Sequence, residues 1–111
     1  MQNPVPSPIH VYFALLPGSL VLDWAGPAEA LRIANQALVG RGQPERFVQH
    51  FVSPHPESVS SVGAVLTQLE PLPATLPRPA WVVLVGLAGQ HIAVDGEEAR
   101  ALLHWLRGLR P

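Results

Sequence analysis

The feature that most constrains the fold is a run of eight almost entirely apolar residues near the N-terminus. Residues 9–16 read IHVYFALL, are rich in β-branched and aromatic side chains, and are followed at once by Pro17 and Gly18. A strand with one solvated face alternates apolar and polar residues, whereas a strand buried on both faces of a parallel sheet is apolar almost throughout. The run therefore predicts a central strand of a parallel sheet, with helices covering both faces of that sheet.

A helical pattern follows the Pro-Gly turn. Apolar residues recur there at spacings of three, four and seven residues, namely Trp24, Ala28, Leu31 and Leu38. Pro27 would damage a helix interior but is tolerated in a first turn, so we expect the helix to begin between Asp23 and Gly26. It should end near Gly40 or Gly42, because glycine is favoured where helices end.

Three shorter segments read as β structure. Residues 47–53 (FVQHFVS) predict a second strand, and residues 81–85 (WVVLV) predict a third buried strand. Between them, residues 58–69 carry valines around Gly63 without helical spacing, which predicts either a short hairpin or a strand pair with a bulge at the glycine. The helix between the first two strands is then the crossover of a βαβ unit.

The last predicted element is a second helix. Asp95 as N-cap with Glu98 three residues later has the arrangement of a capping box. Apolar residues then follow on one predicted face, namely Ala99, Leu102, Leu103 and Leu106. The helix should run to about Gly108.

The alternation of buried strands with helices favours an α/β fold of the flavodoxin-like kind, an open and mostly parallel sheet with helices on both faces. Residues 1–8 are proline-rich and predict a disordered or extended lead. Such a sheet needs a strand after the final helix, but the chain ends at Pro111. Either that helix packs at the edge of a small sheet, or the sequence is one piece of a longer protein. We favour the second, a fold incomplete at its C-terminal side.

Composition excludes several classes of function. The chain has no cysteine, which excludes disulfides, thiolate metal sites and a cysteine nucleophile within it. Its net charge is −1 and its arginines are scattered, so we expect no nucleic-acid binding and no DNA-binding domain in this segment. No apolar run approaches the roughly 20 residues of a membrane span. The polar, proline-broken start does not resemble a secretion signal, so we expect a cytoplasmic protein without membrane contact.

The histidines do not suggest a metal centre. They are His10, His50, His55, His91 and His104. They fall on different predicted elements and lack the short helical spacings that zinc sites use. We therefore expect neither a metal nor another cofactor, and we interpret each histidine as a surface residue or a hydrogen-bonded core residue.

Three segments resemble the ThiJ/PfpI superfamily, which includes DJ-1-like and class I glutamine amidotransferase-like domains, and within it the GlxA family of AraC-type regulators. The motifs are VYFALLPG (11–18) running into LDWAGPAEAL (22–31) with Ala34-Asn35 after it, VSP (52–54) leading to VSSVG (59–63), and VVLVG (82–86). The resemblance spans residues 9 to about 107. The related isonitrile hydratases share the first motif, so the second motif and the Asn35 region favour the regulators.

The resemblance implies a role for Asp23. It matches the acidic position that, in enzymatic members, points at a nucleophilic cysteine and holds or shuttles its proton. The family places that cysteine on an elbow after the last predicted helix, so these residues complete no catalytic site and we expect no enzyme activity. A simpler interpretation is that Asp23 only caps the first helix by accepting N–H bonds from Ala25 or Gly26.

Two glycine turns are candidates for ligand binding, because open α/β sheets bind ligands at the carboxyl ends of their strands. Their backbone N–H groups are suited to a small anion or an oxyanion. The candidate ligand-binding residues are Gly18, Ser19, Asp23, Gly86, Leu87 and His91. The alternative is that the glycines serve only to turn the chain.

The resemblance predicts a ligand-sensing, non-catalytic domain of a bacterial AraC-type transcription regulator, acting as a homodimer through this α/β domain. DNA would be bound only by a C-terminal helix-turn-helix domain that is absent here. Trp105 is predicted to point away from Leu102 and Leu106, onto a surface that a second subunit buries. One alternative is an N-terminal fragment of an isonitrile hydratase-like or amidase-like enzyme. Another is a degenerate product that folds poorly. The residues do not identify the effector or the regulated genes.

Overall fold

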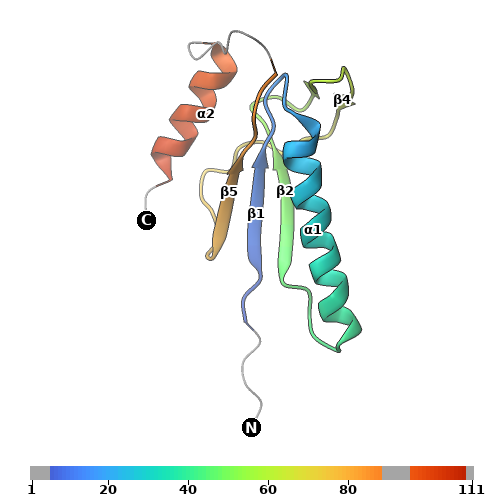
Figure 1. The fold of residues 1–111 in the computed structure, drawn as a ribbon. Coiled ribbons are helices and arrows are strands. Elements are labelled where there is room, and N and C mark those ends of the chain that lie inside the picture. The colour runs from blue at the N-terminus through green and yellow to red at the C-terminus, as the bar shows by residue number, and fades with distance from the viewer. Residues whose placement is uncertain (1–5, 89–95, 110–111) are drawn as a thin grey trace.

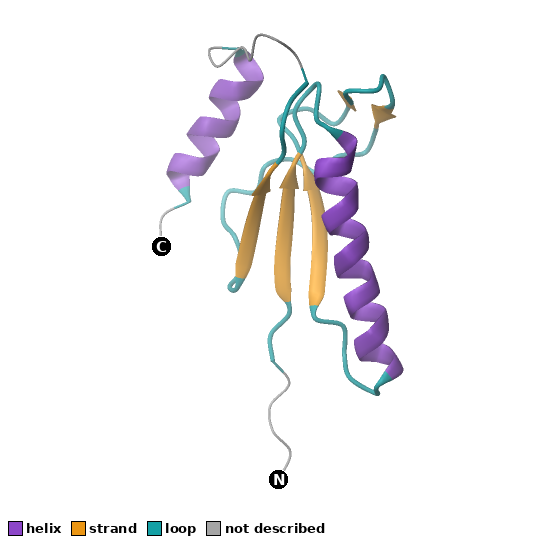
Figure 2. Ribbon diagram, in the orientation of Figure 1, coloured by secondary structure: helices purple, strands orange, loops and turns teal. Residues whose placement is uncertain are grey.

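The computed structural model describes residues 6–88 and 96–109, which form a parallel sheet with a helix on each face (Figures 1 and 2). The elements are β1 (Ile9–Ala14), α1 (Val21–Gly40), β2 (Phe47–Val52), β3 (Ser58–Val59), β4 (Val65–Leu66), β5 (Ala80–Leu84) and α2 (Glu97–Gly108). The three-stranded sheet has the order β2-β1-β5, and β1 pairs in parallel with both neighbours. The predicted α/β class and central first strand are confirmed. Residues 6–8 have no regular secondary structure.

Alternation along β1 divides the core into two clusters. On one face, Val11, Phe13 and Leu15 are buried and pack against α1 residues Trp24, Ala28 and Leu31. On the other face, the buried residues are Tyr12, Ala14, Val52 and Trp105, the last of them from α2. Successive side chains of a strand point to opposite faces, so a continuously apolar strand supplies both clusters.

Helix α1 begins earlier than predicted. It starts at Val21 with Leu20 as N-cap, and no side chain caps it, so the expected start between residues 23 and 26 is wrong. Pro27 lies inside the helix, in its second turn. The turn before the helix is held by backbone hydrogen bonds, including one from Leu20 N–H to the Gly86 carbonyl at 2.9 Å, and this fixes an earlier start. The predicted end at Gly40 is confirmed.

Helix α2 runs to Gly108 as predicted, but its inward face differs from the prediction. Trp105 is only 8% exposed and packs in the core beside Leu102 and Leu106, whereas Leu103 is 47% exposed. The Trp105 indole N–H also donates to the Pro73 carbonyl at 2.6 Å. Trp105 is therefore not part of a surface that a second subunit could bury. The predicted N-cap Asp95 lies outside the described residues.

The predicted hairpin is present as the antiparallel pair of β3 and β4. Gly63 has a φ of +82° and lies in the connecting turn, where its N–H donates to the Ser60 carbonyl at 3.0 Å. The hairpin alternative is therefore confirmed, and the alternative of a strand pair with a bulge at Gly63 is wrong. Only the left-handed conformation is required there, and glycine adopts it without steric cost.

The outer edge of β2 is occupied by a side chain rather than by a strand. The Asn35 carbonyl oxygen accepts the N–H groups of Arg46 and Phe47, each at 2.9 Å, and its amide donates to the Phe47 carbonyl at 2.8 Å. Further along β2, the backbone of Glu70 accepts from Ser53 N–H and donates to the Phe51 carbonyl. Asn35 therefore satisfies the outward peptide groups at the start of β2.

Candidate functional site

Two turns meet at the carboxyl ends of β1 and β5. Gly18 and Ser19 follow β1, and Gly86 and Leu87 follow β5. Ser19 and Leu87 form an isolated antiparallel bridge. Ala88 N–H donates to the Gly18 carbonyl at 2.9 Å, and the two turns are thus joined by backbone hydrogen bonds. Parallel strands end at the same edge, which is why two segments far apart in sequence come together here.

Asp23 closes the same site from the first turn of α1. Its Oδ2 accepts a hydrogen bond from Gly86 N–H at 3.2 Å. A Cβ atom on residue 86 would lie 2.5 Å from that oxygen, so only glycine permits this approach. The alternative in which Asp23 caps α1 is wrong, since α1 has no side-chain cap and this carboxylate bonds across to β5. Its other oxygen has no partner among the described residues, and the side chain is exposed.

Three of the candidate residues already use their backbone N–H groups as donors. Gly18 N–H donates to the Val59 carbonyl at 2.7 Å, Ser19 N–H donates to the Leu16 carbonyl at 3.1 Å, and Gly86 N–H donates to Asp23. An anion at this edge would therefore compete with existing hydrogen bonds. The site also presents the free oxygen of the Asp23 carboxylate, an acceptor suited to an amine, amide or hydroxyl donor.

The structure brings together five of the predicted site residues, namely Gly18, Ser19, Asp23, Gly86 and Leu87. The sixth, His91, lies outside the described residues. Ser19 is buried, and its hydroxyl donates to the Leu16 carbonyl, so it stabilises the turn instead of facing a ligand.

A polar cluster that the sequence did not predict lies on the α2 face of the sheet. His10 Nδ1 and His50 Nε2 are 3.0 Å apart, and His50 Nδ1 lies 3.6 Å from a carboxylate oxygen of Glu70. Tyr12 stacks on His50, with ring centroids 4.4 Å apart. Burial raises the pKa of Tyr12 above its ordinary value, and the negative charge of Glu70 raises that pKa further. The contact between His10 and His50 depends on the register of β1 and β2, and nothing in the sequence predicts that register.

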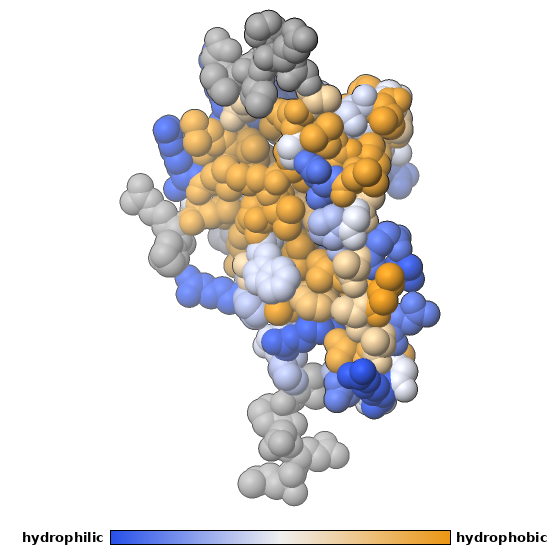
Figure 3. All heavy atoms as spheres, in the orientation of Figure 1, coloured by the Kyte–Doolittle hydropathy of each residue, from blue (hydrophilic) through white to orange (hydrophobic). Residues whose placement is uncertain are grey.

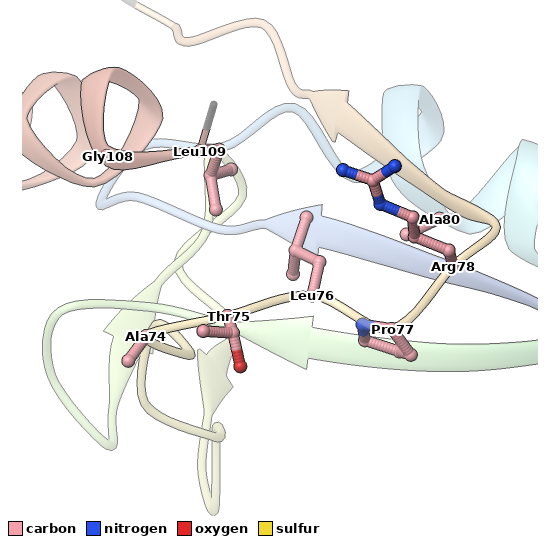
Figure 4. A pocket seen from close by; sticks show the side chains of 8 residues that line it. All are labelled: Ala74, Thr75, Leu76, Pro77, Arg78, Ala80, Gly108 and Leu109. Carbon is pink, nitrogen blue, oxygen red and sulfur yellow. The ribbon is translucent and has the colours of Figure 1, made fainter. Parts of the chain in front are cut away.

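A pocket of about 470 Å³ lies at the opposite end of the sheet (Figure 4). It is lined by Ala74, Thr75, Leu76, Pro77, Arg78, Ala80, Gly108 and Leu109. In Figure 4 the side chains of Leu76 and Leu109 point toward one another across it. Among the described lining residues, Arg78 is the one that carries a charge, and it is exposed. The pocket is separate from the Asp23 site, and its described lining offers no buried polar group.

The described residues contain neither a candidate metal centre nor a helix that could cross a membrane. Within 6–88 and 96–109, no group of three or more His, Asp or Glu side chains is arranged to hold a metal ion. Neither described helix combines the length and the hydropathy needed to cross a bilayer.

A comparison with known proteins gives one informative match. No protein-family model and no curated protein matches the chain in sequence. Among solved structures, it is similar to an AraC family transcriptional regulator from Pseudomonas putida, with a TM-score of 0.50 and 17% identity. The match covers 87% of this chain and 57% of that chain. The chain thus has the α/β fold of part of an AraC-family regulator, and it spans little more than half of that structure's length.

Proposed function

We propose that this chain is the N-terminal part of a ThiJ/PfpI-like, ligand-sensing domain of a cytoplasmic bacterial AraC-type transcription regulator. The observation that carries the proposal is the exposed Asp23 carboxylate, fixed by Gly86 at the edge where open α/β sheets bind ligands. The fold similarity to a solved AraC-family regulator supports it. DNA recognition would belong to a helix-turn-helix domain outside these residues.

Asp23 serves binding rather than catalysis in this proposal. A hydratase-like or amidase-like reaction in this superfamily would need a thiol nucleophile from outside these 111 residues, which contain no cysteine. In the structure, one carboxylate oxygen of Asp23 accepts a hydrogen bond from Gly86 N–H, and the other is exposed and free to bind a ligand. We expect an effector that presents a hydrogen-bond donor, preferably a cationic amine, because a charge-assisted bond to a carboxylate is stronger than a neutral one.

The uncovered side of β5 supports a larger domain. Trp81 and Leu84 point to opposite faces of the sheet and are 47% and 59% exposed. Figure 3 shows apolar side chains gathered over β5 and β1, beside α1. No strand pairs with the outer side of β5 within the described ranges. A further strand and helix there would bury this surface, and we propose that the complete sensing domain supplies them.

The test is a thermal-denaturation screen with three probe classes, primary amines, carboxamides and polyols. A ligand at a hundredfold excess over its Kd stabilises the folded state by about 2.7 kcal/mol, which gives a measurable rise in Tm. We expect at least one amine to raise the Tm of the wild-type chain and to shift the ¹⁵N–¹H resonance of Gly86.

Three variants make the result specific to the site. Asp23→Asn keeps an acceptor for Gly86 N–H but removes the charge, and Asp23→Ala removes both, so both should lose the amine response. Glu29→Gln removes an exposed carboxylate of the same helix outside the site and should leave the response unchanged. A rise in Tm that persists in Asp23→Ala, or no response to any probe class, would contradict the proposal.

A further inference from the structure

Three ionisable side chains from three separate segments meet on the α2 face of the sheet, and we call them the histidine cluster: His10, His50 and Glu70. His10 lies in β1, His50 lies in β2, and Glu70 follows the hairpin. His10 Nδ1 and His50 Nε2 are 3.0 Å apart, which is hydrogen-bonding distance, and the angle between the two ring planes is 18°. The sensing function proposed above makes no use of these residues.

The backbone fixes the position of each member of the histidine cluster. Tyr12 is the register partner of His50, and His10 lies on the same face of β1 as Tyr12. Tyr12 is buried, and its ring stacks on the His50 ring with centroids 4.4 Å apart. Glu70 N–H donates to the Phe51 carbonyl at 2.9 Å, which holds Glu70 beside β2. The two imidazoles therefore meet because the strands place them together.

Glu70 determines which imidazole donates. A hydrogen bond between two imidazoles needs one nitrogen with a hydrogen and one without. A carboxylate oxygen of Glu70 lies 3.6 Å from Nδ1 of His50, and its negative charge favours a hydrogen on that nitrogen. In the neutral ring, Nε2 of His50 then carries the lone pair. Nδ1 of His10 is therefore the donor, and Nε2 of His50 is the acceptor.

Acid changes the number of hydrogens in this contact. One added proton still leaves one acceptor between the two rings, and the hydrogen bond becomes charge-assisted. A second added proton places hydrogens on both facing nitrogens, which are 3.0 Å apart, so no acceptor remains between them. The hydrogen bond is then lost, and the two rings, which now carry like charges, repel each other.

One carboxylate faces the two rings. The Glu70 side chain is 59% exposed, so solvent weakens its attraction for a charge on His50. Tyr12 is the other ionisable group in contact with His50, and a phenol is uncharged in acid. Glu70 can offset one positive charge on the rings, which leaves a second charge without a counter-charge.

The elements that pack over this face contribute apolar residues. Residues 71–77 read PLPATLP and contain no ionisable side chain. Helix α2 packs against the adjoining core through Leu102, Trp105 and Leu106. At the end of the sheet where the strands begin, close to His10, the chain carries Glu45, Arg46 and Arg78, two positive charges and one negative. These surroundings oppose a second proton on the rings.

We propose that the histidine cluster is an acid-sensitive contact between β1 and β2, which forms at neutral pH and breaks when both imidazoles are protonated. It goes beyond the sensing function and does not rest on it. In the unfolded chain both imidazoles are free to take up a proton, whereas the intact contact takes up one. Because the unfolded state binds more protons in acid, the stability from this contact is present at neutral pH and is lost as the pH falls.

The test is urea denaturation at about pH 7.5 and about pH 5, a range in which histidine changes its charge. His10→Gln keeps an N–H donor for His50, but its amide takes up no proton. Between the two pH values, the unfolding equilibrium constant of the wild type should rise roughly tenfold more than that of His10→Gln, the size of one hydrogen bond. His104→Gln makes the same change at an exposed position of α2 and should follow the wild type.

Two further measurements separate the contact from a general effect on folding. In a double-mutant cycle, His10→Ala and His50→Ala should be coupled at the higher pH and lose that coupling at the lower one. The imidazole ¹⁵N spectrum of the wild type needs no variant, and at neutral pH it should show the hydrogen of both rings on Nδ1. Equal pH dependence of the wild type and His10→Gln, or a spectrum with a hydrogen on neither facing nitrogen, overturns the proposal.

Discussion

The two faces of the sheet are held by different kinds of interaction, although β1 contributes to both. Under α1 the cluster is wholly apolar, and Phe13 stacks on Phe51 with ring centroids 5.3 Å apart. Under α2 the cluster adjoins the His10–His50 contact, and Tyr12 carries a titratable hydroxyl. The α1 face is held mainly by apolar packing, with one hydrogen bond from the Gln49 amide to the Ala28 carbonyl at 3.0 Å, and none of these groups titrates near neutral pH. The α2 face also contains the His10–His50 contact and the phenol of Tyr12, whose pKa is raised by burial.

The largest loss of stability should come from a substitution in the apolar cluster under α1. Phe13 is fully buried, so Phe13→Ala removes a large side chain and leaves a cavity. We expect a loss of about 3–5 kcal/mol in the free energy of unfolding, measured by urea denaturation, with no dependence on pH between about 6 and 9. Val59→Ala, at a half-exposed position of the hairpin, should cost far less. A loss below about 1 kcal/mol for Phe13→Ala would show that this face is not the principal core.

A smaller loss is expected on the α2 face from Trp105→Phe. Phenylalanine retains most of the apolar area but cannot donate to the Pro73 carbonyl. We expect a loss of about 1–2 kcal/mol in the unfolding free energy. Trp81→Phe changes the same residue type at a half-exposed position and should cost less. Equal losses for the two variants would mean that the indole hydrogen bond contributes nothing measurable.

The smallest effect should be confined to alkaline pH and to Tyr12. Burial first, and Glu70 second, raise the pKa of Tyr12, so the folded chain holds the phenolic proton more tightly than the unfolded chain does. The resulting stability is fully present below the ordinary tyrosine pKa of about 10 and is lost as the pH rises through the higher folded value. Tyr12→Phe should therefore lose less stability than the wild type between about pH 9 and pH 11.

Tyr12 can also be followed directly. It is the one tyrosine of the chain, so tyrosinate absorbance reports on this residue alone. Absorbance in the native chain should rise at a higher pH than in the chain unfolded by urea. Coincident titrations of the two states would contradict the predicted difference between the two faces.

The sequence predicted most of the element order, because buried strands and amphipathic helices leave direct patterns in the chain. It failed where the outcome depends on tertiary contacts. The early start of α1 at Val21 depends on a turn bonded to Gly86, and the burial of Trp105 depends on a carbonyl of a distant loop.

The sequence likewise predicted part of the candidate site and missed the part that depends on tertiary contacts. That the turns after β1 and β5 meet follows from parallel strands, and the family resemblance pointed to Asp23. The hydrogen bond from Gly86 N–H to Asp23 could not be predicted, because it depends on the path of two loops. The contact of His10 with His50 likewise requires the strand register, which short apolar strands do not specify from their own residues.

The side chain of Asn35 also determines how the edge strand β2 opens. In most sheets, the outer amides of an edge strand exchange freely with solvent, or are protected by a neighbouring strand. Here the amides of Arg46 and Phe47 are protected by a residue of α1. We therefore expect their hydrogen exchange to report the detachment of the helix, with the C-terminal half of α1 and the start of β2 opening as one cooperative unit.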